Sequence, residues 1–274
     1  MGLFGKLFEK KECAICGGEI GLLGNRKLED GNMCKACAAK LSPWFDERRH
    51  STVAQIEEQL EYRESNKENV AAFRTTLSLG ETAKVLVDED AGRFMVTSAR
   101  NYSEANPDVL ELSDITGCTY DIDESIDEVT RFDENNEAVS YDPPRFTHSY
   151  NFYVTVYVNN PYFDDMRLKV NSRTVEVEER RGPAVSANPG SINLVIGSLS
   201  GAETFNPEAS VEYCTYRDLC ERIVATLLEN RQSAREEIAA AAAPKAAVAC
   251  PYCGATTTPT TTNCCEFCGG ALGD

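Results

Sequence analysis

The chain has 274 residues, a formal net charge of −17 at pH 7 and a hydrophobic fraction of 42%. This length suffices for one large domain or for two to three small ones with packed cores. The acidic balance argues against a nucleic-acid-binding surface over the whole molecule, because phosphate binding requires clustered Lys and Arg. No run approaches the roughly 20 apolar residues of a membrane span, and the start of the chain does not resemble a secretory signal.

The first twelve residues contain four apolar side chains at helical spacing beside lysines, namely Leu3, Phe4, Leu7 and Phe8. This pattern has two interpretations. Residues 1–12 form either a short amphipathic foot that contacts a membrane surface, or a chain start that packs its apolar side on the following module.

Eight of the 12 cysteines form four C-x-x-C pairs, two pairs near each end of the chain. Two thiolates in one tight turn can direct their sulfurs at one ion, and a second pair completes the tetrahedron that zinc prefers. We therefore expect two structural zinc ions, with iron or disulfides as the alternatives. The expected ligand sets are Cys13, Cys16, Cys34 and Cys37, and Cys250, Cys253, Cys265 and Cys268.

The other four cysteines show no paired spacing, which favours a reducing cytoplasm over a disulfide-forming compartment. They are Cys118, Cys214, Cys220 and Cys264. Because Cys264 adjoins Cys265, it competes with Cys265 as a ligand. We choose Cys265, since Cys265-x-x-Cys268-Gly269 repeats the spacing of Cys250-x-x-Cys253-Gly254.

The first module, residues 13–50, has turn signals at Gly24-Asn25 and Asp30-Gly31, which predict a small hairpin between the two pairs. The second pair then enters a helix that Pro43 ends. A treble-clef finger has this order: a cysteine pair, a hairpin, and a second cysteine pair at the start of a helix.

Residues 10–75 are similar to an N-terminal four-cysteine zinc-finger family of unknown function from bacteria. The motifs that carry this resemblance are Cys13-x-x-Cys16-Gly17, Ile20-Gly21-Leu22-Leu23-Gly24, Lys27-Leu28, Asp30-Gly31, Cys34-x-x-Cys37, Lys40-Leu41-Ser42-Pro43, Arg48-Arg49, Ser51-Thr52-Val53 and Gln59-Leu60. The resemblance implies a metal-binding module and no particular activity.

Residues 51–79 read as a helical arm that Ser51 or Thr52 caps and that continues to about Leu77. Its apolar residues, Val53, Ile56, Leu60, Val70 and Phe73, share one face. Arg63 and Lys67 interrupt this face. The helix therefore serves either for coiled-coil pairing or as an arm that packs on the next domain.

Residues 80–235 contain short runs rich in β-branched and aromatic residues, separated by Asp, Asn, Gly and Pro. The predicted strands are Ala83–Val87, Arg93–Thr97, Val109–Leu112, Gly117–Ile122, Phe146–Val158, Met166–Val170 and Arg173–Glu179. A helix over Ala209–Ala242 follows, with a buried stripe formed by Tyr216, Leu219, Cys220, Ile223, Leu227 and Leu228. This order resembles a bacterial pleckstrin-homology-like β-barrel with a C-terminal helix, and an orthogonal β-sandwich plus helix fits equally well.

The most acidic segment of the chain is Asp121–Glu128. It does not fit a calcium loop, because Glu128 occupies the position that requires glycine when the loop starts at Asp123. We interpret the segment as a solvated acidic loop.

Catalytic motifs are missing from the sequence. Of the two histidines, His148 is expected to be a half-buried strand residue. The segment Tyr141–Phe146 is expected to be a turn stiffened by its prolines. Residues 236–249 form an Ala-rich linker, and residues 250–274 resemble the zinc ribbons appended to many bacterial proteins.

The sequence thus predicts an α+β multidomain protein without enzymatic activity. We expect a cytoplasmic scaffold or adaptor that binds a protein partner, with the first turn as a contact to the inner face of the membrane. A nucleic-acid-associated regulator is the alternative, which only the basic pairs Arg26-Lys27 and Arg48-Arg49 favour.

Overall fold

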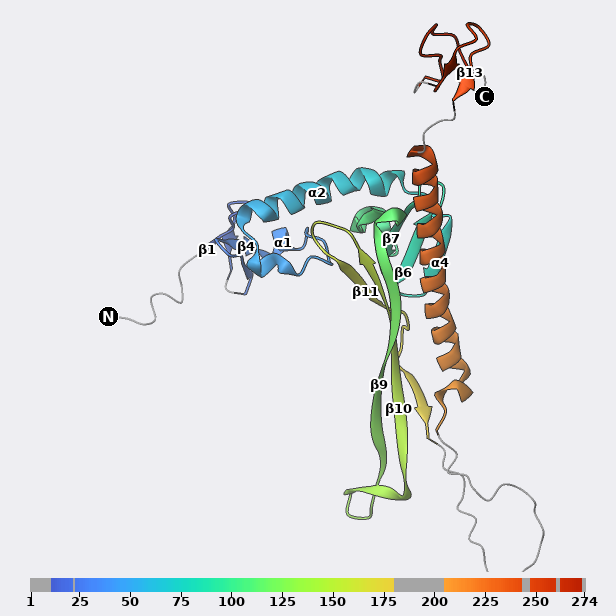
Figure 1. The fold of residues 1–274 in the computed structure, drawn as a ribbon. Coiled ribbons are helices and arrows are strands. Elements are labelled where there is room, and N and C mark those ends of the chain that lie inside the picture. Colours follow the sequence, from blue (N-terminus) through green and yellow to red (C-terminus); the bar gives the residue numbers. More distant parts are fainter. Residues whose placement is uncertain (1–10, 22, 180–204, 243–246, 260–261, 273–274) are drawn as a thin grey trace, which may run out of the picture. The chain divides into compact units, whose positions relative to one another are not determined.

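The computed structural model describes residues 11–21, 23–179, 205–242, 247–259 and 262–272. The predicted foot with Leu3, Phe4, Leu7 and Phe8 lies outside these residues. The chain divides into two compact units, Met1–Arg231 and Gln232–Asp274. Several antiparallel sheets and few helices make up a mixed α/β architecture (Figure 1).

The N-terminal module consists of two small antiparallel pairs, a short helix and a 3₁₀ turn. These elements are β1 (Lys11–Glu12) with β2 (Glu19–Ile20), β3 (Asn25–Lys27) with β4 (Asn32–Cys34), α1 (Lys35–Ala38) and η2 (Glu47–His50). The core of the module contains Leu28 and Met33, and Ile56 from the next helix completes it. The module therefore shares its core with the element that follows.

Helix α2 (Val53–Ala72) begins at a capping box, in which the Thr52 side chain accepts from Gln55 N–H and the Gln55 side chain accepts from Thr52 N–H. The helix ends at Ala72 and not near Leu77 as expected. Its buried residues are Ile56, Gln59, Arg63, Asn66 and Val70. The interpretation of Arg63 as an interruption of the buried face was wrong, because Arg63 lies within that face.

The first four-stranded sheet is an antiparallel meander in chain order. Its strands are β5 (Leu77–Gly80), β6 (Lys84–Asp88), β7 (Arg93–Thr97) and β8 (Val109–Glu111), with α3 (Tyr102–Ala105) before β8 and η3 (Leu112–Asp114) after it. Strand β5 was not predicted, since its two leucines continue the apolar pattern of the preceding helix. The buried carboxylate of Asp88 accepts from Arg74 N–H and helps to separate helix from strand.

The second sheet is built around the long strand β10 (Ala138–Val158). β9 (Ile115–Phe132) pairs with one edge of β10, and β11 (Asp165–Lys169) and β12 (Val175–Glu178) pair with successive parts of the other. The predicted strand Phe146–Val158 forms the second half of β10, and its residues Phe152, Val154 and Val156 are completely buried on one face.

The acidic segment Asp121–Glu128 belongs to β9 and is not a loop, which corrects the sequence-based interpretation. Each of its residues has a partner in β10, which its inward-facing backbone groups contact. Its carboxylates remain exposed because β9 is an outer strand with side chains on both faces. The Pro-containing segment after Tyr141 lies inside β10, where the register shifts between Ser140 and Arg145.

Helix α4 (Val211–Ala242) follows a short 3₁₀ turn, η4 (Pro207–Ala209). Its buried residues are Tyr216, Cys220, Ile223 and Leu227, as predicted, while Leu219 and Leu228 are half-buried. The rings of Tyr213 and Tyr216 lie 5.2 and 5.8 Å from the ring of Phe152 in β10. The helix thus contributes to the core of the second sheet.

The C-terminal unit contains one small antiparallel pair, β13 (Val248–Ala249) with β14 (Thr256–Thr257). Its core consists of Cys250, Cys265 and Leu272. So small a core leaves metal ligation as the main source of stability for the unit. Across the described ranges of the whole chain, no helix has the length and apolarity to cross a membrane.

Candidate metal centres

The structure brings the eight predicted cysteines together in two groups of four. Within each group, all four sulfur atoms lie within 4.8 Å of one another. The groups are Cys13, Cys16, Cys34 and Cys37, and Cys250, Cys253, Cys265 and Cys268. No third group of this kind occurs among the described residues.

The sulfur–sulfur distances match a tetrahedral ion. Four Zn–S bonds of roughly 2.3 Å at tetrahedral angles place the sulfurs about 3.8 Å apart. The sulfurs lie 3.9 Å apart in Cys16 and Cys34, 3.6 Å apart in Cys250 and Cys268, and 3.7 Å apart in Cys253 and Cys265. A disulfide would need about 2 Å, so these pairs are not disulfides.

Backbone amides surround the first group. The N–H groups of Cys34 and Cys37 point at the sulfurs of Cys13 and Cys34, each at 3.3 Å. Cys34 also caps α1, so a helix N-terminus faces the ligands. Gly17 adopts a φ of 68° and donates to Cys13 C=O, which closes the turn between the first two cysteines.

These amides also influence the ionisation of the thiols. Burial opposes ionisation of Cys13, but backbone N–H donors led by Cys34 lower the pKa of this thiol to about 6. Burial and the neighbouring sulfurs raise the pKa of Cys37 to about 12. Two protons therefore leave at very different pH values unless a cation replaces them.

The second group consists of two turns with the same hydrogen bonds. Cys250 N–H donates to Ala255 C=O at 2.9 Å, and Cys265 N–H donates to Gly270 C=O at 2.8 Å. Gly254 and Gly269 have φ values of 73° and 70° and occupy equivalent positions. The repeated spacing that favoured Cys265 in the sequence thus corresponds to a repeated structure.

Cys264 is not a member of the second group. Its sulfur donates to Thr262 C=O at 3.4 Å, and its backbone forms an isolated bridge with Ala271. Every position of a four-coordinate ion is filled by a cysteine in both groups, which leaves no open position for a substrate. The two separate four-cysteine sites are each able to hold a metal ion, and they fit two structural zinc ions.

Comparison with known families adds one match. Residues 11–59 match the model of a domain of unknown function, DUF4428. The match includes the whole first cysteine group and the first turns of α2. It carries no activity, which agrees with the resemblance seen in the sequence. No curated protein and no solved structure has a significant match to this chain.

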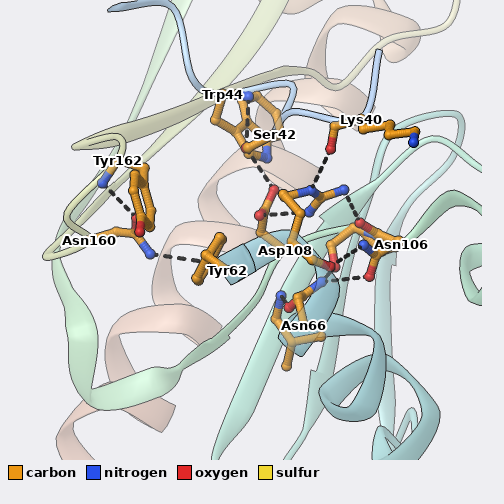
Figure 2. Close-up of polar contacts among 12 residues, drawn as sticks. Lys40, Ser42, Trp44, Tyr62, Asn66, Asn106, Asp108, Asn160 and Tyr162 are labelled. Atoms are coloured by element: carbon orange, nitrogen blue, oxygen red, sulfur yellow. Dashed lines mark hydrogen bonds and ion pairs between the residues drawn. The ribbon is translucent and has the colours of Figure 1, made fainter. Parts of the chain in front are cut away.

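A buried polar network connects the first metal module to the first sheet (Figure 2). Arg63 of α2 contacts Asp108 at 2.8 Å, and the two side chains are 8% and 0% exposed. Ser42, which follows the last ligand of the first group by five residues, donates its hydroxyl to the other Asp108 oxygen at 2.8 Å. Arg63 also donates to Lys40 C=O and to Asn106 C=O.

Asn66 extends the network along α2. Its amide nitrogen donates to Pro107 C=O at 2.7 Å and to Asn106 Oδ1 at 2.9 Å, and its oxygen accepts from Val109 N–H at 3.0 Å. These bonds provide partners for backbone N–H and C=O groups of the segment that enters β8. The network therefore fixes α2, the metal module and the first sheet in one arrangement.

Burial raises the pKa of Asp108, whereas the Arg63 and Ser42 bonds oppose this rise. Sequence reasoning missed the network because it treated Arg63 as a break. The spacing of Gln59, Arg63, Asn66 and Val70 at steps of four and three residues was the available signal, since it continues the buried face from Ile56.

His148 lies in a strand, β10, as predicted, but it is buried and not half-buried, with an exposed fraction of 7%. Its Nδ1 is 2.7 Å from Glu124 Oε1, and its ring stacks on Phe205 at a centroid distance of 3.7 Å. These contacts explain the histidine as part of the core of the second sheet.

Proposed function

We propose that this chain is a zinc-binding, non-catalytic scaffold or adaptor. The observation that carries the proposal is the closed four-cysteine composition of both metal groups, which suits structure and leaves no reactive position. A thiolate-only tetrahedron also selects zinc among common divalent ions, with iron as the competitor.

Elemental analysis of the purified chain, prepared without chelators, tests the metal. Two zinc ions per chain are expected. A colourless protein with clearly fewer than two zincs, or a coloured protein with iron, contradicts the assignment.

The finer fold assignments support the same role. A hairpin between cysteine pairs and a last pair that opens α1 agree with a treble-clef finger. Two four-stranded antiparallel sheets followed by α4 agree with a pleckstrin-homology-like domain over residues 80–235. Domains of this architecture commonly present binding surfaces, so we propose a protein partner. Affinity purification with the wild type and with Cys250→Ser tests whether that partner depends on the C-terminal site.

The proposed location is cytoplasmic, with a reversible contact to the inner face of the membrane. The four apolar side chains of the first turn, Leu3, Phe4, Leu7 and Phe8, would contribute a few kcal/mol at about 25 cal/mol per Å². Co-sedimentation with liposomes should detect binding that disappears when residues 1–10 are deleted. Binding that survives this deletion contradicts the proposed contact.

One observation favours the alternative of nucleic-acid binding. Burial, together with repulsion from Arg26 and Arg49, lowers the pKa of Arg48, so these guanidinium groups gather on one part of the first module. A basic cluster of this kind suits phosphate groups. The net charge of −17 opposes the alternative. A salt-resistant, sub-micromolar complex in a gel-shift assay would replace the adaptor proposal with this one.

A further inference from the structure

Strand β9 has one unpaired edge. β10 is the only strand that pairs with β9 among the described residues, and β11 and β12 lie on the far side of β10 (Figure 1). β9 is 18 residues long. Thr116 C=O accepts from Arg231 at 3.2 Å. From Gly117 onward, the outer N–H and C=O groups of β9 can pair with another extended chain.

The side chains of β9 alternate between two kinds of surface. Tyr120, Ile126 and Phe132 share the even-numbered face and are 37%, 57% and 72% exposed. Glu124, which bonds His148 and Tyr150, and Glu128 lie between them on the same face. Asp121, Asp123 and Asp127 share the opposite face and are all exposed. The alternation is continuous there, because the bulge near the tip is formed by additional residues of β10 and not of β9.

The carboxylates are only partly neutralised within the chain. Arg167 of β11 lies 2.6 Å from Asp121 and 3.6 Å from Asp123. In the described part of the chain, no basic side chain forms a salt bridge with Asp127 or Glu128, so charge remains for a partner to neutralise.

The same charges select against a second copy of the chain. Five carboxylates occur between Asp121 and Glu128, with no basic residue between them. Antiparallel pairing of two β9 strands would place these carboxylates opposite one another, which is unfavourable. The carboxylates would attract a basic strand, whereas they would repel an acidic strand or a second β9.

We propose that the free edge of β9 binds an extended peptide segment that alternates basic and apolar side chains. Its backbone would add a strand to the sheet, its lysines or arginines would face the aspartates, and an apolar residue would cover Ile126. The inference goes beyond the proposed function. It assigns a surface distant in sequence from both cysteine groups and stands whichever metal they hold.

The probe is a nine-residue peptide of alternating lysine and valine, titrated into the full-length, metal-loaded chain by calorimetry. We expect binding that weakens with salt. Two control peptides are used. In the first, the valines are kept and the lysines are replaced by glutamate. In the second, the sequence is kept and the backbone nitrogens are methylated at alternate positions. Each control should bind at least tenfold more weakly. Equal binding of the glutamate peptide or of the methylated peptide would overturn the proposal, as would no binding of the lysine peptide.

Variants locate the site. Asp127→Lys and Ile126→Ser should each weaken the lysine–valine peptide several-fold, because they change the charged and apolar faces separately. Glu57→Lys makes the same charge change on an exposed position of α2 and should have no effect. Equal effects of Asp127→Lys and Glu57→Lys would show that only the net charge of the protein matters, and would contradict binding at the β9 edge.

Amide exchange measured by NMR completes the test. Alternate amides of β9 should exchange fast in the free protein and slowly with the peptide bound. If the same amides are already protected in the free chain at low concentration, another segment of the chain covers the edge. If protection appears only at high concentration, a second copy covers it. Either result overturns the proposal, and neither bears on zinc content.

Discussion

The guanidinium group of Arg63 lies 2.8 Å from the carboxylate of Asp108, and both side chains are buried. The two residues come from a helix and from the segment that enters β8. Ser42 and Lys40, close behind the last cysteine ligand of the first group, complete the contact. A metal module and a β-sheet are therefore joined by charge and hydrogen bonds, and not by apolar packing alone.

The first prediction concerns this ion pair. Asp108→Ala should lower the free energy of unfolding by about 3–5 kcal/mol, because Arg63 would remain buried without a counter-charge. Glu64→Ala is the control, since it removes an exposed pair with Lys67 and should cost less than about 1 kcal/mol. Urea denaturation of the metal-loaded chain measures both. Similar losses for the two variants would show that the buried pair contributes no more to the free energy of unfolding than the exposed pair.

A second prediction compares two glycines in the first sheet. Gly80 has a φ of 102°, and a Cβ there would lie 2.2 Å from Ala83 C=O. Gly80→Ala should therefore destabilise the protein by about 3 kcal/mol. Gly92 also has a positive φ, of 66°, but its Cβ would meet no atom within 4 Å.

Gly92→Ala should accordingly cost only about 1 kcal/mol, the strain of the left-handed backbone itself. Thermal unfolding followed by circular dichroism separates the two variants. A loss at Gly92 as large as that at Gly80 would mean that the backbone conformation alone, and not the close approach, determines the cost.

The third prediction tests the choice between adjacent cysteines. Cys265→Ser should lower the zinc content by one ion per chain, and Cys264→Ser should leave it unchanged, because only Cys265 belongs to the sulfur group. Atomic absorption on matched preparations provides the measurement. The reverse pattern would transfer the ligand role to Cys264.

The fourth prediction concerns pH. Hydrogen bonds from His148 and Tyr150 lower the pKa of Glu124. Because the folded-state pKa is lowered, ionised Glu124 stabilises the folded protein at pH values above the unfolded-state pKa of about 4.3. This stabilisation is lost as the pH falls through the folded-state pKa. The stability difference between wild type and Glu124→Gln should therefore be positive at pH 7 and shrink in acid.

This difference should stay within about 1 kcal/mol, because the Glu124 side chain is 43% exposed. Tyr150→Phe removes one of the two donors and should reduce the pH dependence without abolishing it. A difference that is constant from pH 7 to pH 3 would rule out the hydrogen-bonded carboxylate as its source.

Local patterns predicted much of this structure, and contacts between distant residues account for what they missed. Cysteine spacing identified both metal groups, and the periodic stripe of apolar residues identified the buried face of α4, since both patterns depend on residues close together in the sequence. The acidic part of β9 was read as a loop because charge suggested solvent, yet a strand with an open edge exposes its side chains while its backbone is paired. Arg63 could not be placed without knowledge of Asp108, 45 residues away in the chain.

The unequal packing of the two cysteine groups has a kinetic consequence. The first group lies against a core that includes Leu28, Met33 and Ile56. In the described part of the C-terminal unit, the core around the second group contains Leu272 and two of the cysteines. A chelator that competes for the metals should therefore strip the C-terminal ion in a fast phase and the N-terminal ion in a slow one. Under metal limitation the chain would then persist in a half-loaded form, with its first module intact and its last module unfolded.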